Sequence, residues 1–406
     1  PCREPIAERL KQLFTQSHPN YYGFNYVAGK FFAIKNQPPN DQPMLVVMDS
    51  PMNPGSERVI VDPNRIDTSG RTAMDFYVVS PDARFVAVSL SHGGTEDGDV
   101  HVYRVADGTA LADVVPRVNG PTAGGDVAWL PDASGFYYTH YPREGERPAE
   151  DMRFFQQIYF HKLGTTTDAD TYVLGKKFPR IAEIDFVSSP DGRAILAVVA
   201  NGDGGEFAHY LRWRTGKWVQ LTRFEDKITS AAFGPDHSLY LLSTADAPRR
   251  KILQLRPGKT RLSRARTIVP PSDRVITGFV PTTHYLYVAD ILGGPSLLRR
   301  VNLSDGQQQD LPLPEVASVG AMTPLGGDKL LYRVSTYVEP SAAYVYDPAT
   351  GKAERTPLAG ESIADFSNVE VKREFARSKD GTMVPMTVLR PKGIKLDGDN
   401  PTVLYG

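Results

Sequence analysis

A short hairpin pattern recurs seven times along the chain, and this repeat constrains the fold more than any other feature of the sequence. Each copy consists of a turn rich in Gly, Pro and Asp, a compact apolar strand, a polar loop and a second strand. The copies begin at residues 29, 80, 130, 189, 234, 282 and 326, and are therefore spaced by 44 to 59 residues. One four-stranded blade of a β-propeller takes about 40 to 50 residues. The repeat therefore predicts an all-β chain with a seven-bladed β-propeller.

The local chemistry of the repeats agrees with hairpins. SPDARFVAVSL at 80 and SPDGRAILAVVA at 189 are typical copies. Proline presets φ at the second position of a tight turn, and aspartate bonds the backbone just ahead. Helical periodicity is nearly absent between residues 21 and 358, so we expect the propeller to fill this range.

The first and last repeats indicate how the ring closes. NYYGFNYV, KFFAIK, MLVVMD and ERVIVD supply four strands for the first blade, and VGAMT, KLLYRVS, SAAYVYD and KAERTPL supply four for the last. Because neither blade needs a borrowed strand, we expect closure without strand exchange. Side-chain packing between the two blades should then hold the ring shut, and this seam should be weaker than a hydrogen-bonded one.

Composition narrows the classes of partner. The 46 Lys and Arg residues balance 47 Asp and Glu residues, so the net charge of −1 gives no general reason to expect nucleic acid or an anionic membrane as a partner. No apolar run approaches the roughly 20 residues that cross a bilayer. Cys2 is the only cysteine, which excludes an internal disulfide framework. We expect a monomer.

Known catalytic and metal-binding motifs are missing from the sequence. The eight histidines show no metal-ligand spacing, and there is no GxSxG or P-loop motif. We therefore predict no metal and no cofactor. His101, His161 and His209 fall in predicted strands, where a hydrogen-bonded structural role is expected. Ser91 and His92 are sequence neighbours in a glycine-rich stretch with no predicted scaffold to orient them for catalysis.

Two polar loops carry the candidate site residues. Both SHGGTEDGD at 91–99 and NGDGGEF at 201–207 follow the second strand of a blade. Equivalent loops of a propeller lie on one side, so we expect both loops on the same face. Glu96, Asp97, Asp203 and Glu206 would then face a cavity at one end of the ring and contact substrate. The alternative is that both loops are solvated turns.

The segment from 137 to 163 is longer than its neighbours, and it holds three arginines among acidic residues. We interpret it as an exposed loop between two strands. A flap, or a contact to a partner domain, is the alternative.

The last stretch, RSKDGTMVPMTVLRPKGIKLDGDNPTVLYG, indicates a strand, a turn at Asp380-Gly381 and a second strand, with a further strand opening at Val403. This stretch resembles the point at which the prolyl oligopeptidase family of serine peptidases leaves its propeller and begins its α/β-hydrolase domain. VDPNRIDTSGRTAMDFYVVSPDARFVAVSLS, AWLPDASGFYYTHYPRE and QQIYFHKLGT resemble blades of the same propeller. PCREPIAERLKQLF resembles the helix that leads into it.

The resemblance implies a division of the chain into a helix and linker at 1–20, the propeller at 21–358 and the start of the hydrolase domain at 366–406. In this family the propeller caps the active site, admits short peptides and excludes folded proteins. A Ser, Asp and His triad on the hydrolase domain cleaves after proline. All three triad residues would lie beyond residue 406, as would the oxyanion tyrosine, which Tyr405 is not. The chain alone is therefore predicted to be inactive.

Three points stay open at this stage. Some family members carry arginine and cysteine on pocket loops where this chain has Ala200, Asn201, Gly202, Asp203 and Gly204, so the strict post-proline preference is not carried over. The family favours a cytoplasmic location, but the chain begins at Pro1 without Met, which leaves a periplasmic one open. A stand-alone binding propeller and an inactive peptidase homologue are the alternative functions.

Overall fold

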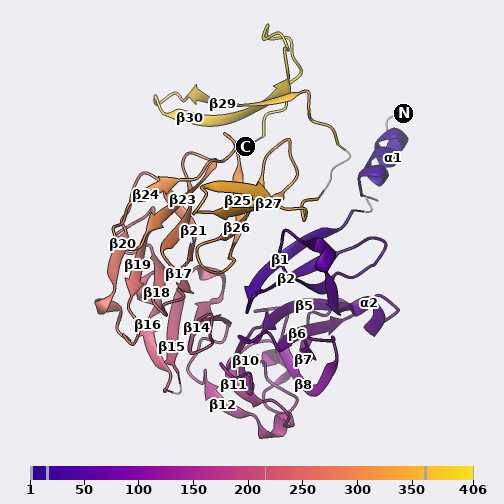
Figure 1. Ribbon diagram of the computed structural model, residues 1–406, viewed down its shortest axis with the longest axis vertical. Coiled ribbons are helices and arrows are strands. Elements are labelled where there is room, and N and C mark those ends of the chain that lie inside the picture. The colour runs from indigo at the N-terminus through magenta and orange to yellow at the C-terminus, as the bar shows by residue number, and fades with distance from the viewer. Residues whose placement is uncertain (1–2, 15–17, 215, 361–363, 406) are drawn as a thin grey trace.

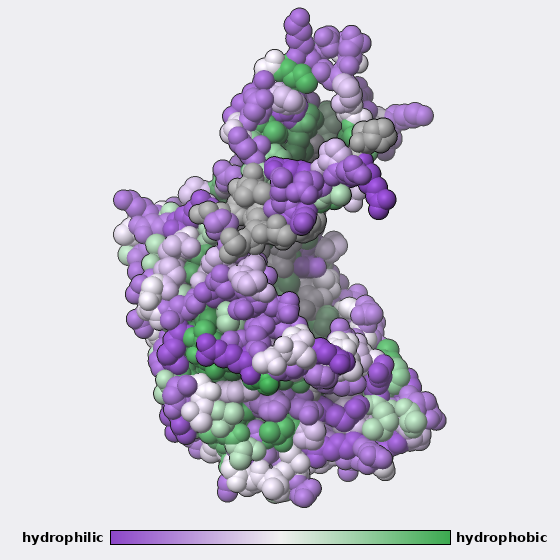
Figure 2. Space-filling view, turned by 90° about the vertical axis from the view of Figure 1, so that its right-hand side faces the viewer, coloured by the Kyte–Doolittle hydropathy of each residue, from purple (hydrophilic) through white to green (hydrophobic). Residues whose placement is uncertain are grey.

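The computed structural model describes residues 3–14, 18–214, 216–360 and 364–405. Seven four-stranded antiparallel sheets form a ring of blades, and a separate two-stranded hairpin lies beyond the last blade (Figure 1 and Figure 2). Within every blade the strands are hydrogen-bonded in sequence order. The seven-bladed propeller predicted from the repeat is thus confirmed.

The first four blades hold sixteen strands. They are β1 (Asn20–Val27), β2 (Lys30–Asn36), β3 (Met44–Met48) and β4 (Arg58–Val61); β5 (Thr72–Val79), β6 (Phe85–His92), β7 (Gly98–Arg104) and β8 (Ala110–Asn119); β9 (Val127–Trp129), β10 (Gly135–His140), β11 (Gln157–Lys162) and β12 (Thr171–Leu174); β13 (Ala182–Ser188), β14 (Ala194–Asn201), β15 (Phe207–Trp213) and β16 (Val219–Thr222).

The other three blades and the hairpin complete the sheet structure. They are β17 (Ile228–Phe233), β18 (Leu239–Ser243), β19 (Lys251–Leu255) and β20 (Arg266–Val269); β21 (Val275–Pro281), β22 (Tyr285–Ile291), β23 (Ser296–Asn302) and β24 (Gln308–Asp310); β25 (Ser318–Pro324), β26 (Leu330–Ser335), β27 (Ala342–Asp347) and β28 (Lys352–Arg355); then β29 (Val369–Arg377) and β30 (Met383–Pro391).

Helical structure is minor. The helices are α1 (Arg3–Phe14) and α2 (Pro63–Ile66), with the 3-10 turns η1 (Pro54–Ser56), η2 (Ala149–Asp151), η3 (Thr167–Ala169), η4 (Gly202–Gly204), η5 (Phe224–Asp226) and η6 (Leu262–Arg264). Within the part of the chain that the structure describes, no helix is long and apolar enough to span a membrane.

Aspartates fix the turns between the first and second strands. Asp82 accepts hydrogen bonds from the Ser80 hydroxyl (2.7 Å) and the Arg84 amide (3.0 Å). In the fourth blade, Asp191 makes the same two contacts, with the Ser189 hydroxyl at 2.8 Å and the Arg193 amide at 3.1 Å. The Ser-Pro-Asp signature therefore works as predicted, because one carboxylate satisfies the donors of a tight turn.

The first strand of each blade lines the centre of the ring. Residues from the ends of β1, β5, β9, β13, β17, β21 and β25 surround one central cavity of about 400 Å³. The side chains between neighbouring blades form the core; for example, Phe32 and Leu45 of the first blade pack with Val86 and Val88 of the second. Each blade therefore has two apolar faces, which agrees with the dense apolar patterns of the second strands.

The seam between the first and last blades contains no shared strand. β1 pairs only with β2, and β25 only with β26. Phe31 and Val46 of the first blade pack against Leu331 and Ala343 of the last. The Arg333 guanidinium also donates to the Tyr21 carbonyl oxygen across this seam at 3.4 Å. Closure by side-chain packing, as predicted, is confirmed.

The hairpin β29–β30 confirms the predicted strand, turn and strand, with Arg377 opposite Met383 and Val369 opposite Pro391. The predicted strand at Val403 is wrong. Residues 401–405 have no strand structure, and Val403, Leu404 and Tyr405 are each more than 90% exposed. A strand needs a hydrogen-bonded neighbour, and in the described part of the chain nothing pairs with this segment.

Candidate functional site

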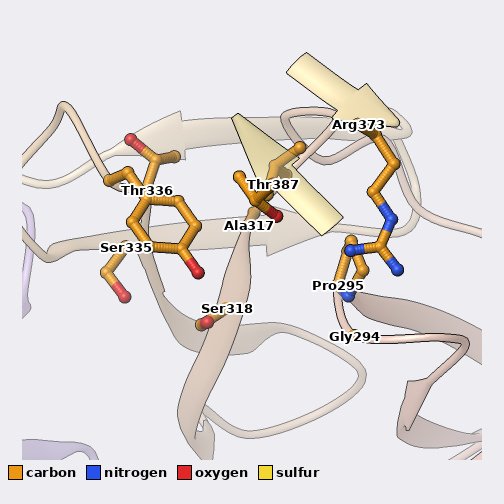
Figure 3. A pocket seen from close by; sticks show the side chains of 10 residues that line it. Gly294, Pro295, Ala317, Ser318, Ser335, Thr336, Arg373 and Thr387 are labelled. Carbon is orange, nitrogen blue, oxygen red and sulfur yellow. The ribbon is translucent and has the colours of Figure 1, made fainter. Parts of the chain in front are cut away.

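The hairpin marks one face of the propeller. Arg373 and Thr387 occupy the same hairpin face, and they line a cavity of about 330 Å³ together with Gly294, Ala317 and Thr336 of the last two blades (Figure 3). Gly294 lies between β22 and β23, and Thr336 lies between β26 and β27. The hairpin thus covers the connections between the second and third strands of these blades.

A pair of glycines brings Arg373 close to the propeller. Gly293 and Gly294 have φ values of 62° and 128°, which side-chain-bearing residues rarely adopt. A Cβ atom at Gly294 would lie 3.0 Å from Nη1 of Arg373. The glycines therefore provide both the turn and the space for the guanidinium (Figure 3).

The two candidate loops occupy equivalent connections in other blades. One joins β6 to β7 and the other joins β14 to β15. Repeat geometry carries equivalent connections to one side of a propeller. Glu96, Asp97, Asp203 and Glu206 therefore lie on the face that bears the hairpin. Whether they contact substrate stays a prediction.

The four acidic residues have different surroundings. Asp203 is exposed and lines a cavity of about 250 Å³ with Phe154, Ile181 and Glu183. Asp97 lies 4.0 Å from the Arg117 guanidinium. Glu206 accepts a hydrogen bond from Asn201 within its own loop, at 3.3 Å. The backbone oxygen of Glu96 is bound by Asn119 (2.8 Å), while its side chain is exposed.

Further acidic residues on the inner strands join this group. Burial raises the pKa of Glu183 on β13, and the charges of Asp203 and Asp185 raise it further. Burial likewise raises the pKa of Asp75 on β5, with a contribution from Glu96. Each candidate loop therefore lies within electrostatic reach of an inner-strand carboxyl group. We call this group of carboxylates, on the hairpin-bearing face at the second to fourth blades, the acidic mouth. Arg153 and Arg180 line the same cavity as Asp203 and Glu183.

The sequence interpretation missed Asp75, Glu183 and Asp185, although the sequence carried a signal for the last two. Glu183 and Asp185 alternate along β13 in AEIDFV, and alternate positions of a strand share a face. An acidic pair on the first strand of a blade would have pointed to the centre of the ring, which the first strands line. Asp75 stands alone in TAMDFYVV and gave no comparable signal.

The long segment after β10 is tied down around this mouth. Arg117 donates to the carbonyl oxygens of Pro142 (3.0 Å) and Met152 (2.7 Å). The guanidinium of Arg180 lies 3.7 Å from the Phe154 ring centroid and bonds Asp151 at 2.9 Å. Of the segment 137–163 that was interpreted as an exposed loop, only 141–156 is a loop, because 137–140 belong to β10 and 157–162 to β11. Tyr141 and Gln156 at its two ends are buried, and the contacts above attach it to the propeller.

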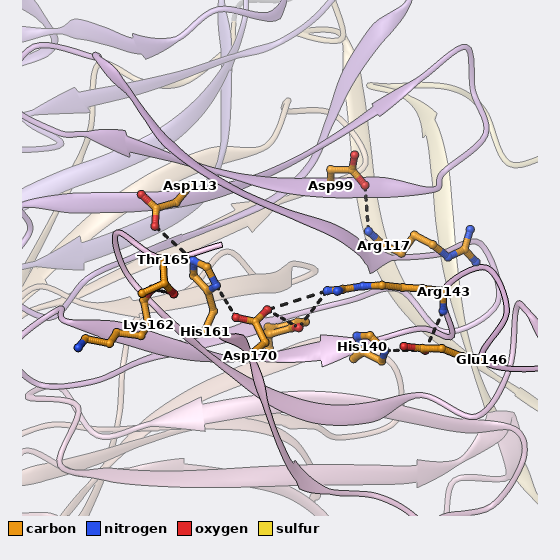
Figure 4. Close-up of polar contacts among 11 residues, drawn as sticks. Asp99, Asp113, Arg117, His140, Arg143, Glu146, His161, Lys162, Thr165 and Asp170 are labelled. Atoms are coloured by element: carbon orange, nitrogen blue, oxygen red, sulfur yellow. Dashed lines mark hydrogen bonds and ion pairs between the residues drawn. The ribbon is translucent and has the colours of Figure 1, made fainter. Parts of the chain in front are cut away.

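A buried charge network lies next to that loop. His161 donates toward Asp170 at 2.7 Å and toward Asp113 at 3.2 Å, and it has no exposed surface (Figure 4). Tyr138 donates to Asp170 at 2.8 Å. Because the imidazole is fully enclosed, its role is structural, as predicted. His209, bonded to Thr222 at 2.6 Å, is likewise structural.

These features can be compared with known proteins. Residues 1–357 match the sequence profile of the prolyl oligopeptidase N-terminal β-propeller domain. The chain belongs to the prolyl oligopeptidase family.

Two relatives with similar sequences are named prolyl endopeptidases. The chain is 25% identical over 422 residues to the prolyl endopeptidase of Elizabethkingia meningoseptica, covering 100% of this chain and 56% of that protein. It is 27% identical over 429 residues to the prolyl endopeptidase of Elizabethkingia miricola, with the same coverage. The chain thus spans little more than half the length of these curated relatives.

Solved structures of prolyl oligopeptidases share the fold. A structure from a study of two prolyl endopeptidases matches with a TM-score of 0.82 at 24% identity, over 97% of this chain and 57% of that one. Prolyl oligopeptidase B from Galerina marginata matches with a TM-score of 0.76 at 19% identity, over 96% of this chain and 58% of that one.

Ser91 and His92 do not form the nucleophile and base of a prolyl oligopeptidase. The expectation that they lie in a loop is wrong, since both end strand β6. Adjacent strand residues point to opposite faces. Ser91 donates to Asp75 at 2.6 Å, whereas His92 contacts Thr72 at 3.2 Å. The described residues also hold no group of three or more potential metal ligands.

Proposed function

We propose that this chain is the gating propeller of a serine peptidase that cleaves short peptides after proline. The membership of the family supports this proposal, together with the likeness to proteins named prolyl endopeptidases. The observation that carries it is the hairpin β29–β30, whose Arg373 and Thr387 lie over the connections of the last two blades. A catalytic domain that continued from this hairpin would cover the same face.

The acidic mouth supports a role in peptide binding. The cavity beside Asp203 combines the apolar side chains of Phe154 and Ile181 with the carboxyl groups of Asp203 and Glu183. Arg153 and Arg180 also line it, and Arg180 is paired with Asp151. Such a mixture of an apolar wall and a few charged groups suits a peptide side chain. We infer that Glu96, Asp97, Asp203 and Glu206 face incoming peptides and favour those with positive charge.

The triad is assigned to the hydrolase domain, not to this chain. Covalent catalysis needs a nucleophile within hydrogen-bond reach of a base. The neighbouring pair Ser91 and His92 does not meet this need, because each side chain bonds a different partner. We therefore expect the 406-residue chain to be inactive on its own.

The test compares two proteins on one substrate. A full-length protein carrying this chain should release the leaving group of a peptidyl-proline amide and should lose activity with a serine-directed covalent inhibitor. Rigorously purified 1–406 protein should release none. Inhibitor-sensitive turnover by 1–406 would overturn the assignment of the triad. An inactive, inhibitor-insensitive full-length protein would favour a binding scaffold or an inactive homologue.

A further inference from the structure

The outer half of the fifth blade carries a strong local charge. Between residues 247 and 272 the sequence contains eight Lys and Arg residues and no Asp or Glu, in a chain whose total charges almost cancel. These residues are Arg249, Arg250, Lys251, Arg256, Lys259, Arg261, Arg264 and Arg266. They lie on and around β19, η6 and β20. Figure 1 shows β19 and β20 on the outer edge of the ring. We call this set the blade-five cations.

The blade-five cations are not neutralised within the protein. Six of the eight are exposed, and the other two, Arg250 and Lys251, are partly so. Arg250 donates to the carbonyl oxygen of Ile276 and Arg266 to the side chain of Gln254, both of which are uncharged. In the described part of the chain, none of the eight forms an ion pair with a carboxylate. Their charge therefore faces solvent.

A cavity of about 380 Å³ adjoins this surface, between the fourth and fifth blades. Arg193, Trp213, Arg214 and His237 line it, with Pro257 and Gly258 from the loop between β19 and β20. Arg256 and Lys259 flank the last two residues in the sequence. The cavity is thus continuous with the blade-five cations.

A second cavity, of about 460 Å³, shares two of the same arginines. Arg193 and Arg214 line both cavities, and Arg212 joins them in the second. The Arg212 guanidinium lies 5.2 Å from the Tyr137 ring centroid. Arg214 is exposed, and its side chain has no hydrogen-bonded or ionic partner among the described residues. Its guanidinium is available to an external anion.

Three carboxylates on this surface already have hydrogen-bond or ionic partners within the protein. Asp132 accepts from the amide (3.1 Å) and hydroxyl (2.7 Å) of Ser134. Asp236 accepts from the amide (3.0 Å) and hydroxyl (2.7 Å) of Ser238. Asp191 lies between Nε2 of His237 (2.9 Å) and Nε of Arg193 (3.4 Å). These three carboxylates offset part of the charge, but they leave Arg214 and the blade-five cations unpaired.

The surface lies away from the hairpin. The two cavities and the cations from Arg256 to Arg266 lie at loops that connect first to second strands (189–193 and 234–238) and third to fourth strands (between β15 and β16, and 256–265), whereas the hairpin covers connections between second and third strands. Arg249, Arg250 and Lys251 lie at the connection between β18 and β19, at the hairpin end, and are not part of this surface. Successive connections in an antiparallel sheet alternate between its two ends. The basic surface is therefore separate from the acidic mouth at which we place peptide binding.

The side chains of this surface indicate which class of anionic partner it fits. A bilayer would be bound by exposed apolar anchors beside the cations, yet the blade-five segment contributes no exposed large apolar side chain. Single-stranded nucleic acid is held by exposed aromatic rings, and the indole of Trp213 is half-buried. Two concave cavities with paired guanidinium groups suit carboxylate side chains, which arginine binds with two parallel hydrogen bonds.

We propose that the two cavities and the five blade-five cations on the same end of the blade, Arg256, Lys259, Arg261, Arg264 and Arg266, form a docking surface for an acidic polypeptide segment. Glutamate or aspartate side chains occupy the cavities and bond Arg193 and Arg214, while these five cations attract the rest of the segment. This interaction is independent of peptide cleavage. It gives the propeller a second binding face, for an acidic tail or an acidic partner protein.

The test uses fluorescein-labelled octaglutamate and fluorescence anisotropy at low ionic strength. The double variant Arg193→Gln/Arg214→Gln should bind the probe about tenfold more weakly than the unaltered protein, because two charge-assisted contacts are lost. Lys259→Gln/Arg261→Gln should also weaken binding. The matched control, Lys352→Gln/Arg355→Gln, removes the same charge from the exposed β28 and should leave binding unchanged.

Two results would overturn the proposal. One is an equal loss of affinity in the control, which would show attraction by net charge alone. The other is saturable binding of a single-stranded oligonucleotide or of anionic vesicles, weakened by Arg193→Gln/Arg214→Gln, when octaglutamate does not bind. Octaglutamate affinity that falls steeply with added salt and responds only to the blade-four and blade-five variants would support it.

Discussion

The imidazole of His161 lies between two carboxylates, 2.7 Å from Asp170 and 3.2 Å from Asp113, and joins the second blade to the third. Burial lowers the pKa of His161, but the bonds and charges of Asp170 and Asp113 outweigh it and hold the pKa above its ordinary value. A charged, enclosed imidazole therefore connects neighbouring blades.

Replacing His161 by Gln should destabilise the protein by about 3 to 5 kcal/mol at pH 6, because two buried carboxylates lose their cation. The pKa of His161 is raised in the folded state. Its stabilising effect is therefore complete below its pKa in the unfolded chain, about 6.5, and is lost as the pH rises through its pKa in the folded protein. Urea denaturation at several pH values checks this. His92→Gln, at an exposed position, is the control. A destabilisation that grew with rising pH would contradict the assignment.

The buried carboxyl group of Asp126 should also make the stability of the protein depend on pH. Its carboxylate accepts from the Phe186 amide of the next blade at 2.7 Å, and burial raises its pKa to about 7. The neutral form is favoured in the folded state, so this group stabilises at low pH, and that effect is lost as the pH rises toward 7. Asp126→Asn should therefore gain in thermal stability relative to the unaltered protein between pH 5 and pH 7. A constant difference across that range would argue against a raised pKa.

The seam of the ring should open before other blade interfaces. No two of the seven blades share a strand, but the first and last, where Phe31 packs against Leu331, are also neighbours that are not consecutive along the chain. The amides of β1 and β25 should exchange hydrogen faster than those of β9 and β13, because local opening begins where the fewest strong contacts must break. Hydrogen exchange with mass spectrometry measures this. Equal protection in all seven inner strands would show that closure is not the weak point.

The glycine pair under Arg373 offers a local test of hairpin docking. Gly294→Ala would place a Cβ 3.0 Å from Arg373 at a φ of 128°. We expect faster proteolysis of the β29–β30 turn in this variant. Gly94→Ala provides the control, since its φ of 73° carries backbone strain while the added Cβ meets nothing within 4 Å. Faster cleavage in both variants would mean that general destabilisation is responsible.

The acidic mouth should influence peptide preference. Asp203→Asn/Glu183→Gln should lower the ratio of kcat/KM for a lysine-containing over a glutamate-containing peptide several-fold in the full-length protein, since two nearby carboxylates would be neutralised. Lys-bearing and Glu-bearing peptides with one common prolyl bond provide the comparison. Asp305→Asn/Glu354→Gln, exposed on other blades, is the control. An unchanged ratio would remove the mouth from substrate selection.

The repeat predicted the propeller because each copy carries its own turn chemistry. Asp82 and Asp191 bond their turns with side chains that are close in sequence, so the signal is local. The mouth was predicted less completely. The loop acids Glu96 and Asp203 were visible as polar insertions, whereas their proximity to Asp75 and Glu183 depends on how strands from separate blades meet. A single sequence does not contain that register.

The prediction of a strand at Val403 was wrong for a similar reason. Val403 and Leu404 have the side chains of a strand, but a strand forms only when a neighbour supplies hydrogen bonds. Ser91 and His92 show the opposite error. Their glycine-rich surroundings suggested a loop, and pairing of β6 with β5 and β7 extends the strand through both residues. Tertiary pairing outweighed local composition in each case.

The most direct test of the central claim measures cleavage of one prolyl bond in two contexts by the full-length protein. The bond is placed in a short unstructured peptide and, separately, in an exposed loop of a stable folded protein. A gating propeller predicts cleavage of the peptide after proline and survival of the folded protein, with the products identified by mass spectrometry. Comparable cleavage of both substrates, or cleavage of the peptide only at other residues, would contradict the account.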